Sequence, residues 1–304
     1  MLGLMLTARV MAVGVSPAVQ EAQFSTRADL VVLHLSVKDR KGAYVSNLTA
    51  DAFSVLDNKR PQPISFFVDQ DAPVTVGVLI DSSGSMAANR DLMIAAVTSF
   101  AENSNRQDEI FALSFNDDVN AVLPSDTPFT ADPETLRRAL LAAIVPRGRT
   151  ALYDGIAAGL EYLERGTRPR RVLIVISDGG DNASRTTAQK IWQQTQGSNV
   201  LVYTVGVIDE LETEANPKAL KRLAEVTGGE SFRPRSVHDV DMVLRRIATD
   251  IRHAYTIGYV PANTDHDGKF HTVQVAVRSP GGQRVAVRTR TGYLAGDDGR
   301  RSQP

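Results

Sequence analysis

Near both ends of the chain, hydrophobic and polar residues alternate at every second position, which is typical of half-buried β-strands. In the N-terminal part this pattern predicts strands over Leu30–Val37, Phe53–Leu56 and Ile64–Val68. In the C-terminal part it predicts strands over residues 255–259, 273–277 and 285–289. The sequence Ser279-Pro280-Gly281-Gly282 stands between the last two and predicts a hairpin turn that joins them.

Between these flanks, short and continuously apolar runs alternate with helical patterns. The apolar runs, expected to be strands, are Val74–Ile80, Glu109–Phe115, Val172–Ser177 and Val200–Val207. A short strand is also expected over Val119–Leu123. Helices are expected up to about Asn103, after Asp132-Pro133, over 151–163, near 186–194, from Pro217 to Gly228, and over 240–251. The alternation predicts an α/β fold with a doubly wound, mostly parallel sheet flanked by helices, similar to a Rossmann fold.

Neither flank has enough strands to bury a core by itself. We therefore expect residues 23–72 and 255–295 to pair in one sandwich-like all-β unit, into which the α/β domain of residues 73–254 is inserted. The alternative is two small sheets that pack separately on the α/β domain. Residues 296–304 are rich in Gly, Asp and Arg and are expected to form a disordered tail.

Residues 1–22 resemble a secretory signal peptide, although a flexible N-terminal segment is the alternative. The apolar stretch Met1–Val15 precedes Ser16-Pro17-Ala18, a pattern of small residues that favours cleavage near Ala18. No later run approaches the ~20 consecutive apolar residues of a membrane span. We therefore expect an extracytoplasmic protein, periplasmic or secreted and without a stable membrane span; a cytoplasmic location is the alternative.

Charge and cysteine content exclude several function classes. The chain has 34 Lys and Arg against 35 Asp and Glu, for a formal net charge of −1, so it has no overall basic character for nucleic-acid binding. It contains no cysteine, which excludes disulfides, thiolate zinc sites and iron–sulfur clusters. A metal bound here must be held by oxygen or imidazole ligands.

Oxygen-bearing side chains follow two of the apolar runs. Asp81-Ser82-Ser83-Gly84-Ser85 comes directly after the first run, and Asp178-Gly179-Gly180-Asp181 comes after Val172–Ser177. Arg149-Thr150 precedes the helix that opens at Ala151. Because ligands of open α/β sheets bind beyond the carboxyl ends of the strands, these side chains are expected near one another. Carboxylates and hydroxyls suit a hard cation, Mg²⁺ above all, with Mn²⁺ or Ca²⁺ as alternatives. Taken singly, each piece also fits a capping turn or a helix N-cap.

This combination resembles the von Willebrand factor type A domain and its metal-ion-dependent adhesion site, with the pattern DxSxS, a distant Thr and a distant Asp. The resemblance covers roughly Pro73 to Ala254. It implies five cation ligands, with Ser83 and Ser85 binding directly and Asp178 through water; the ligands are Asp81, Ser83, Ser85, Thr150 and Asp178. Ser82, Gly84, Arg149 and Asp181 would surround them. The layout of the flanks also resembles bacterial VWFA-related proteins of the acidobacterial type.

The resemblance implies a non-enzymatic binding module in which the cation coordinates an Asp or Glu of a partner protein. One alternative is a structural or assembly component with an incidental metal. Another is a metal-dependent hydrolase, but the sequence offers no clear general base. The five histidines are dispersed and the HExxH and GxSxG motifs are absent, which leaves Asp181 as the best candidate. We expect no catalytic residue.

Overall fold

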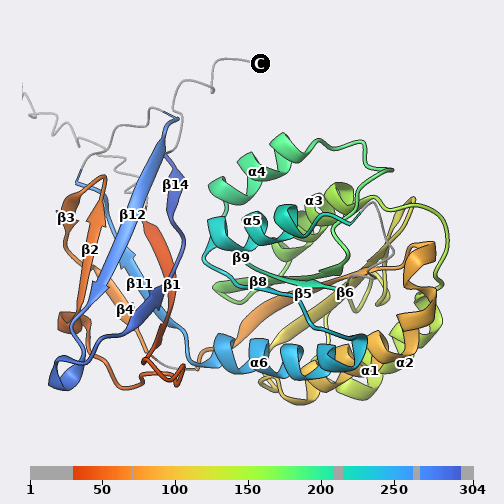
Figure 1. Cartoon of the computed structure of the whole chain (residues 1–304), viewed down its shortest axis with the longest axis horizontal. Coiled ribbons are helices and arrows are strands. Elements are labelled where there is room, and N and C mark those ends of the chain that lie inside the picture. Colours follow the sequence, from red (N-terminus) through yellow and green to blue (C-terminus); the bar gives the residue numbers. More distant parts are fainter. Residues whose placement is uncertain (1–29, 70, 208–214, 263–267, 296–304) are drawn as a thin grey trace, which may run out of the picture.

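The computed structural model describes residues 30–69, 71–207, 215–262 and 268–295. The predicted signal peptide and the predicted C-terminal tail lie outside the described residues. Within them, an α/β domain and a β-sandwich lie next to each other (Figure 1). None of the described helices combines the length and the apolar character needed to cross a bilayer.

The α/β domain is built on a six-stranded sheet in the order β10-β9-β8-β5-β6-β7. Its strands are β5 (Val74–Asp81), β6 (Glu109–Phe115), β7 (Val119–Ala121), β8 (Arg170–Ser177), β9 (Leu201–Gly206) and β10 (Ser231–Phe232). All neighbours are parallel except β7, which runs antiparallel to β6 at one edge. The doubly wound, mostly parallel sheet predicted from the sequence is therefore confirmed.

Helices cover both faces of this sheet (Figure 1). One face carries α1 (Arg90–Glu102), α2 (Pro133–Ala143) and α6 (Val240–Arg252). The other carries α3 (Leu152–Leu163), α4 (Ala188–Gly197) and α5 (Pro217–Thr227). Short 3-10 helices occur at Ala50–Ala52, Gly84–Asn89, Val237–Asp239 and Pro280–Gly282.

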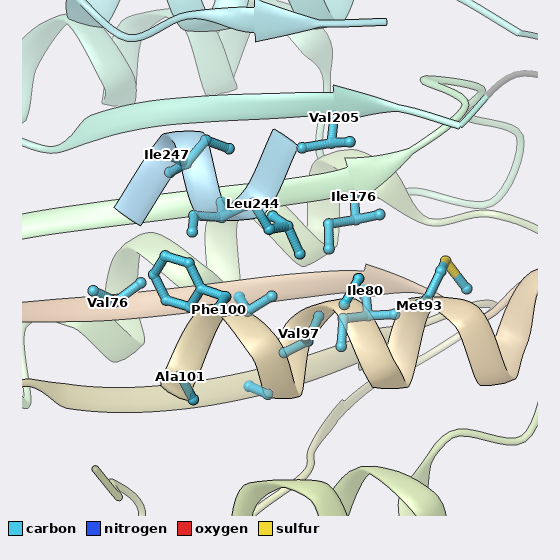
Figure 2. Packing of buried hydrophobic residues seen from close by; sticks show 14 of the residues in the cluster. Val76, Ile80, Met93, Val97, Phe100, Ala101, Ile176, Val205, Leu244 and Ile247 are labelled. Atoms are coloured by element: carbon cyan, nitrogen blue, oxygen red, sulfur yellow. The ribbon is translucent and has the colours of Figure 1, made fainter. Parts of the chain in front are cut away.

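The sheet is buried on both faces because successive side chains of each strand point in opposite directions. Val76 and Ile80 of β5 belong to the core below α1 and α6, whereas Leu79 belongs to the core below α3. Figure 2 shows the first of these cores, where side chains of α1 and α6 meet those of β5, β8 and β9. Each fully buried aliphatic side chain contributes about 1.5–3 kcal/mol, so the two cores hold the strand ends, and the loops that follow them, in place.

The β-sandwich consists of two four-stranded sheets, β13-β1-β11-β4 and β14-β12-β2-β3. From the N-terminal flank come β1 (Val31–Lys38), β2 (Phe53–Asp57), β3 (Arg60–Gln62) and β4 (Phe66–Val68). From the C-terminal flank come β11 (Tyr255–Tyr259), β12 (Phe270–Val277), β13 (Ala286–Arg288) and β14 (Gly292–Leu294). Each sheet takes two strands from each flank, and their inward side chains share one core.

The predicted hairpin across Ser279–Gly282 is wrong. The strand before it, β12, pairs with β2 and β14, whereas the strand after it, β13, pairs with β1 in the other sheet. Residues 280–282 form a short 3-10 helix in which two glycines have positive φ, and this turn leads the chain from one sheet to the other. Alternation of apolar residues sets which face of a strand is buried but does not determine which strand it pairs with.

The junction between the two units is held by a buried carboxylate. Asp250 of α6 accepts hydrogen bonds from the hydroxyls of Tyr203 (2.5 Å) and Tyr44 (2.8 Å) and from the guanidinium of Arg288. Its Oδ1 also lies 3.2 Å from Nζ of Lys38. Burial opposes ionisation of Asp250, but Arg288, Tyr203 and Lys38 together hold its pKa below the usual value. The β-sandwich and the last helix are thus joined through compensated charges.

Candidate functional site

Four of the five predicted ligands line one cleft at the carboxyl end of the central sheet. The cleft has a volume of about 140 Å³ and is lined by Ser83, Gly84, Ser85, Gly148, Arg149, Thr150, Asp178, Gly180 and Asn182. The fifth, Asp81, is the last residue of β5, is 0% exposed and bonds to Ser83 in the cleft wall. The structure therefore brings the end of β5, the end of β8 and the start of α3 together.

Both oxygens of the Asp81 carboxylate accept hydrogen bonds. The backbone N–H of Ser83 donates to Oδ1 at 2.9 Å, and the hydroxyl of Ser177 donates to Oδ2 at 2.7 Å. The Ser177 hydroxyl also accepts a bond from the N–H of Gly179 at 3.0 Å. Ser177 thus links the end of β5 to the loop after β8. Sequence reasoning missed this serine because it closes the apolar run of β8 and belongs to no recognisable motif.

The two serine hydroxyls of the first loop converge, with Oγ of Ser83 and Oγ of Ser85 3.2 Å apart. Neighbouring contacts fix the loop that carries them. The backbone N–H and hydroxyl of Ser82 both donate to the carbonyl of Phe115 at the end of β6, and the N–H of Gly84 donates to the carbonyl of Gly148. Ser82 therefore fastens the loop to the sheet and turns its side chain away from the cleft, whereas Gly84 lies in the cleft wall.

One carboxylate in the cleft lining, Asp178, and one behind its wall, Asp81, have no cationic partner among the described residues. Neither Asp81 nor Asp178 forms an ion pair with any of the described residues. Burial raises the pKa of Asp81 to about 6; bonds from Ser83 and Ser177 oppose this rise, and the charge of Asp178 adds to it. Asp178 accepts a bond from the N–H of Gly180 at 2.7 Å. A cation in the cleft would compensate both charges.

The helix that follows Thr150 is capped by other residues. The N-cap of α3 is Ala151, which makes no side-chain capping bond. The first N–H groups are bonded instead by the loop after β8, where the side chain of Asn182 accepts from Thr150 N–H and that of Asp181 from Tyr153 N–H. Ser184 accepts from Asp154 N–H and donates to Asp181. Asp181 therefore serves the helix rather than the cleft, and the Thr150 hydroxyl is not used as a cap.

Arg149 lies on the rim of the cleft, but its charge is paired. Its Nε lies 2.8 Å from Oδ1 of Asp117, and its backbone N–H donates to Oδ2 at 3.1 Å. These bonds lower the pKa of Asp117. Gly148 has φ of +70°, and a Cβ there would lie 1.8 Å from Oδ2 of Asp117, so the rim requires glycine at this position. Sequence analysis did not identify Asp117 or Asn182, which come from loops outside the motif.

Comparison with known proteins identifies the domain. The family model for the von Willebrand factor type A (VWA) domain matches residues 76–250. The chain belongs to the VWA domain family. A curated relative, the inter-alpha-trypsin inhibitor heavy chain H3 of Pongo abelii, is 24% identical in an alignment of 211 residues that covers 64% of this chain. The match spans 23% of that relative's length.

Solved VWA structures show the same fold. A von Willebrand factor type A protein from Catenulispora acidiphila is 14% identical and matches 90% of this chain and 76% of its own, with a TM-score of 0.52. Its match is longer than the VWA domain, so the likeness in fold includes parts of the flanks. The vWF domain of the type V pili tip protein Mfa5 from Porphyromonas gingivalis is 14% identical, covers 60% of this chain and 95% of its own, and has a TM-score of 0.50.

Proposed function

We propose that this VWA domain binds a divalent cation through Asp81, Ser83, Ser85, Thr150 and Asp178, and that the cation binds an Asp or Glu side chain of a partner protein. Mg²⁺ is the expected ion, with Mn²⁺ and Ca²⁺ as alternatives. VWA domains generally act as protein-interaction modules, which supports a binding role. An extracytoplasmic location, where such a module would meet its partner, is part of the same proposal.

The observation that carries this proposal is the pair of carboxylates without cationic partners beside a small polar cleft. A buried charge without a partner is costly, and proteins usually pair it or bind a metal with it. No three His, Cys, Asp or Glu among the described residues are grouped as metal ligands, so hydroxyls must complete the site. Ser83, Ser85 and Thr150 supply them, and oxygen donors of this kind fit Mg²⁺.

The same residues favour binding over hydrolysis. No described histidine lines the cleft. Asp181, the best candidate for a general base, is engaged by Tyr153 N–H and the hydroxyl of Ser184. Two carboxylates and neutral hydroxyls leave the cation able to take a further oxygen ligand from outside. A carboxylate oxygen of a partner's acidic side chain is a hard donor of the kind that would suit that position.

The first test is calorimetric titration of the full chain with MgCl₂ and MnCl₂. We expect one ion to bind per chain, and Ser83→Ala combined with Ser85→Ala to weaken binding at least about tenfold because two direct donors are lost. Ser54→Ala, an exposed serine of the β-sandwich, is the matched control and should bind as the wild type does. Absence of binding by the wild type, or equal binding by the double variant, would contradict the proposal.

A second test addresses the partner. Immobilised wild type and Asp81→Ala are exposed to an extract of the native source, with Mg²⁺ or with EDTA. A protein retained only by the wild type, and only with Mg²⁺, supports a cation-bridged contact. Retention that is unchanged by EDTA and by the substitution would favour the structural alternative, in which the metal is incidental.

A further inference from the structure

A second recessed surface lies between α5 and the edge strand β10, separate from the metal cleft. It has a volume of about 370 Å³, and its lining includes Lys218, Lys221, Glu225, Ser231 and Arg233. None of its lining residues belongs to the cleft at the end of β5. We call this surface the α5–β10 groove.

Two cationic side chains of the groove have no ionic partner within the described part of the chain. Lys218 and Arg233 form no ion pair with the described residues. Lys221 pairs only with Glu225, at 3.6 Å, and both side chains are more than 60% exposed, so this pair is weak and easily exchanged. Glu230, the other acid in the lining, is engaged by Arg246 at 2.6 Å. The groove therefore offers a local positive charge in a chain whose net charge is −1.

One wall of the groove is the outer edge of the central sheet. Among the residues that the structure describes, the edge strand β10 pairs with β9 alone, with Ser231 opposite Thr204. The N–H of Thr204 donates to the carbonyl of Glu230, so the backbone groups of residues 230 and 232 face β9. In a parallel ladder the groups of the residue between them point the other way. The N–H and C=O of Ser231 therefore face the groove.

The cationic side chains and the side chain of Ser231 lie on the face of the sheet that α5 covers. The Ser231 hydroxyl bonds Thr204 Oγ1, which also bonds the carbonyl of Leu220 in α5, so Ser231 points toward α5. Phe232 lies in the opposite core, below α6. The period of two places Arg233 on the α5 side, with Lys218 and Lys221. A strand added to β10 would meet these cations with every second side chain.

We propose that the α5–β10 groove binds an extended acidic peptide segment of a partner protein, which adds a strand to β10 and places acidic side chains at alternate positions beside Lys218, Lys221 and Arg233. Backbone bonds to Ser231 supply the pairing, and the cations select the charge. A nucleic acid would meet the same charge but could not use the strand edge.

The test is fluorescence anisotropy with a fluorescein-labelled decapeptide of alternating Val and Glu, acetylated and amidated. EDTA is present throughout and Asp81→Ala is included, so that carboxylate binding at the proposed metal site does not contribute. We expect saturable binding that weakens as salt increases, with no binding of a Val and Lys decapeptide. Failure here leaves the metal proposal intact, because magnesium titration measures that site independently.

Two comparisons separate charge from strand pairing. Lys218→Glu with Arg233→Glu should weaken binding at least about tenfold. Lys190→Glu, an exposed charge reversal on α4, should not change it. A peptide N-methylated at alternate residues keeps the charge but cannot pair, and should lose about tenfold or more in affinity. Equal binding of the methylated peptide, equal binding by the charge-reversed variant, or stronger competition by a single-stranded oligonucleotide than by unlabelled peptide would overturn the proposal.

Discussion

Two buried carboxylates, Asp81 and Asp250, are almost equally hidden from solvent but differ in their surroundings. Asp250 is 2% exposed and meets Lys38, Arg288 and two tyrosine hydroxyls, and its pKa is lowered. Asp81 is 0% exposed and meets only hydroxyl and N–H donors, and its pKa rises to about 6. The first carboxylate has its counter-charges within the fold. The second lacks them within the described residues, and the cation that we propose would supply them.

The largest expected effect follows from removing the compensated carboxylate. Asp250→Ala takes the closest carboxylate away from Arg288, which is 25% exposed, and takes the acceptor away from the fully buried Tyr203 hydroxyl. It should lower the free energy of unfolding by about 3–5 kcal/mol. Urea denaturation measures this change. Asp241→Ala, which breaks an exposed pair with Arg245 on the same helix, should cost less than about 1 kcal/mol.

A double substitution checks the reason for that loss. Asp250→Leu together with Arg288→Leu should be less destabilising than Asp250→Ala alone, because Arg288 is removed with its carboxylate and Lys38 keeps Glu230 at 3.8 Å. A double variant at least as unstable as the single one would show that packing, and not charge compensation, holds the junction.

Asp81, the uncompensated carboxylate, should contribute to stability only when a metal ion is bound. At Mg²⁺ concentrations of about 100 times Kd, the wild type should gain about 2.7 kcal/mol of stability. Asp81→Asn should gain none, and in EDTA at pH 8 it should be at least as stable as the wild type, since a buried unpaired charge is removed. Asp126→Asn, an exposed carboxylate, should respond to Mg²⁺ as the wild type does. Equal Mg²⁺ stabilisation of Asp81→Asn would remove the distinction between the two carboxylates.

A buried histidine in the β-sandwich predicts a pH effect. Burial lowers the pKa of His34 to about 3, and Arg170 and Arg290 oppose its protonation further. The unfolded chain takes up this proton near pH 6.5, so the stability that neutral His34 contributes is present above pH 6.5 and is lost as the pH falls toward 3.

Between pH 6.5 and 4.5 this one group should remove about 2 kcal/mol from the free energy of unfolding. His34→Leu should flatten that part of the pH profile measured by urea denaturation. Thr256, the hydrogen-bond partner of His34, keeps a bond from Arg170 in the variant. An unchanged slope would mean that His34 is already protonated in the folded protein.

The smallest effect is expected at the rim of the cleft. Arg149 and Asp117 are both exposed, so Arg149→Ala should shift the melting temperature by less than about 2 °C. Removal of a cation near the cleft should raise Mg²⁺ affinity by about two- to threefold at low salt, and the gain should vanish in 0.5 M NaCl. A large loss of Mg²⁺ affinity would instead place Arg149 among the residues that shape the site.

The α/β domain could be predicted from the sequence because each of its helices and strands has a local sequence pattern. Continuous apolar runs and helical periodicity mark β5, β8 and β9 and the helices between them, and parallel strands meet at one edge by necessity. The order of Asp81, Thr150 and Asp178 along the chain therefore predicted that they lie at one edge of the sheet, where Thr150 and Asp178 line the cleft and Asp81 lies behind its wall. Asp132 at the start of α2 was predicted for the same reason.

The β-sandwich and the surroundings of the cleft depend on contacts between distant segments. Alternation in β12 and β13 shows which side chains are buried but leaves open which sheet each strand joins, and that is settled by pairing with β2 and β1. The bond from Ser177 to Asp81 and the pairing of Arg149 with Asp117 join residues that are 96 and 32 positions apart. Periodicity depends on residues that are close together in the chain. It therefore predicted the local helices and strands and the order of the candidate ligands. Strand partners and charge compensation arise only when the folded chain brings remote side chains together.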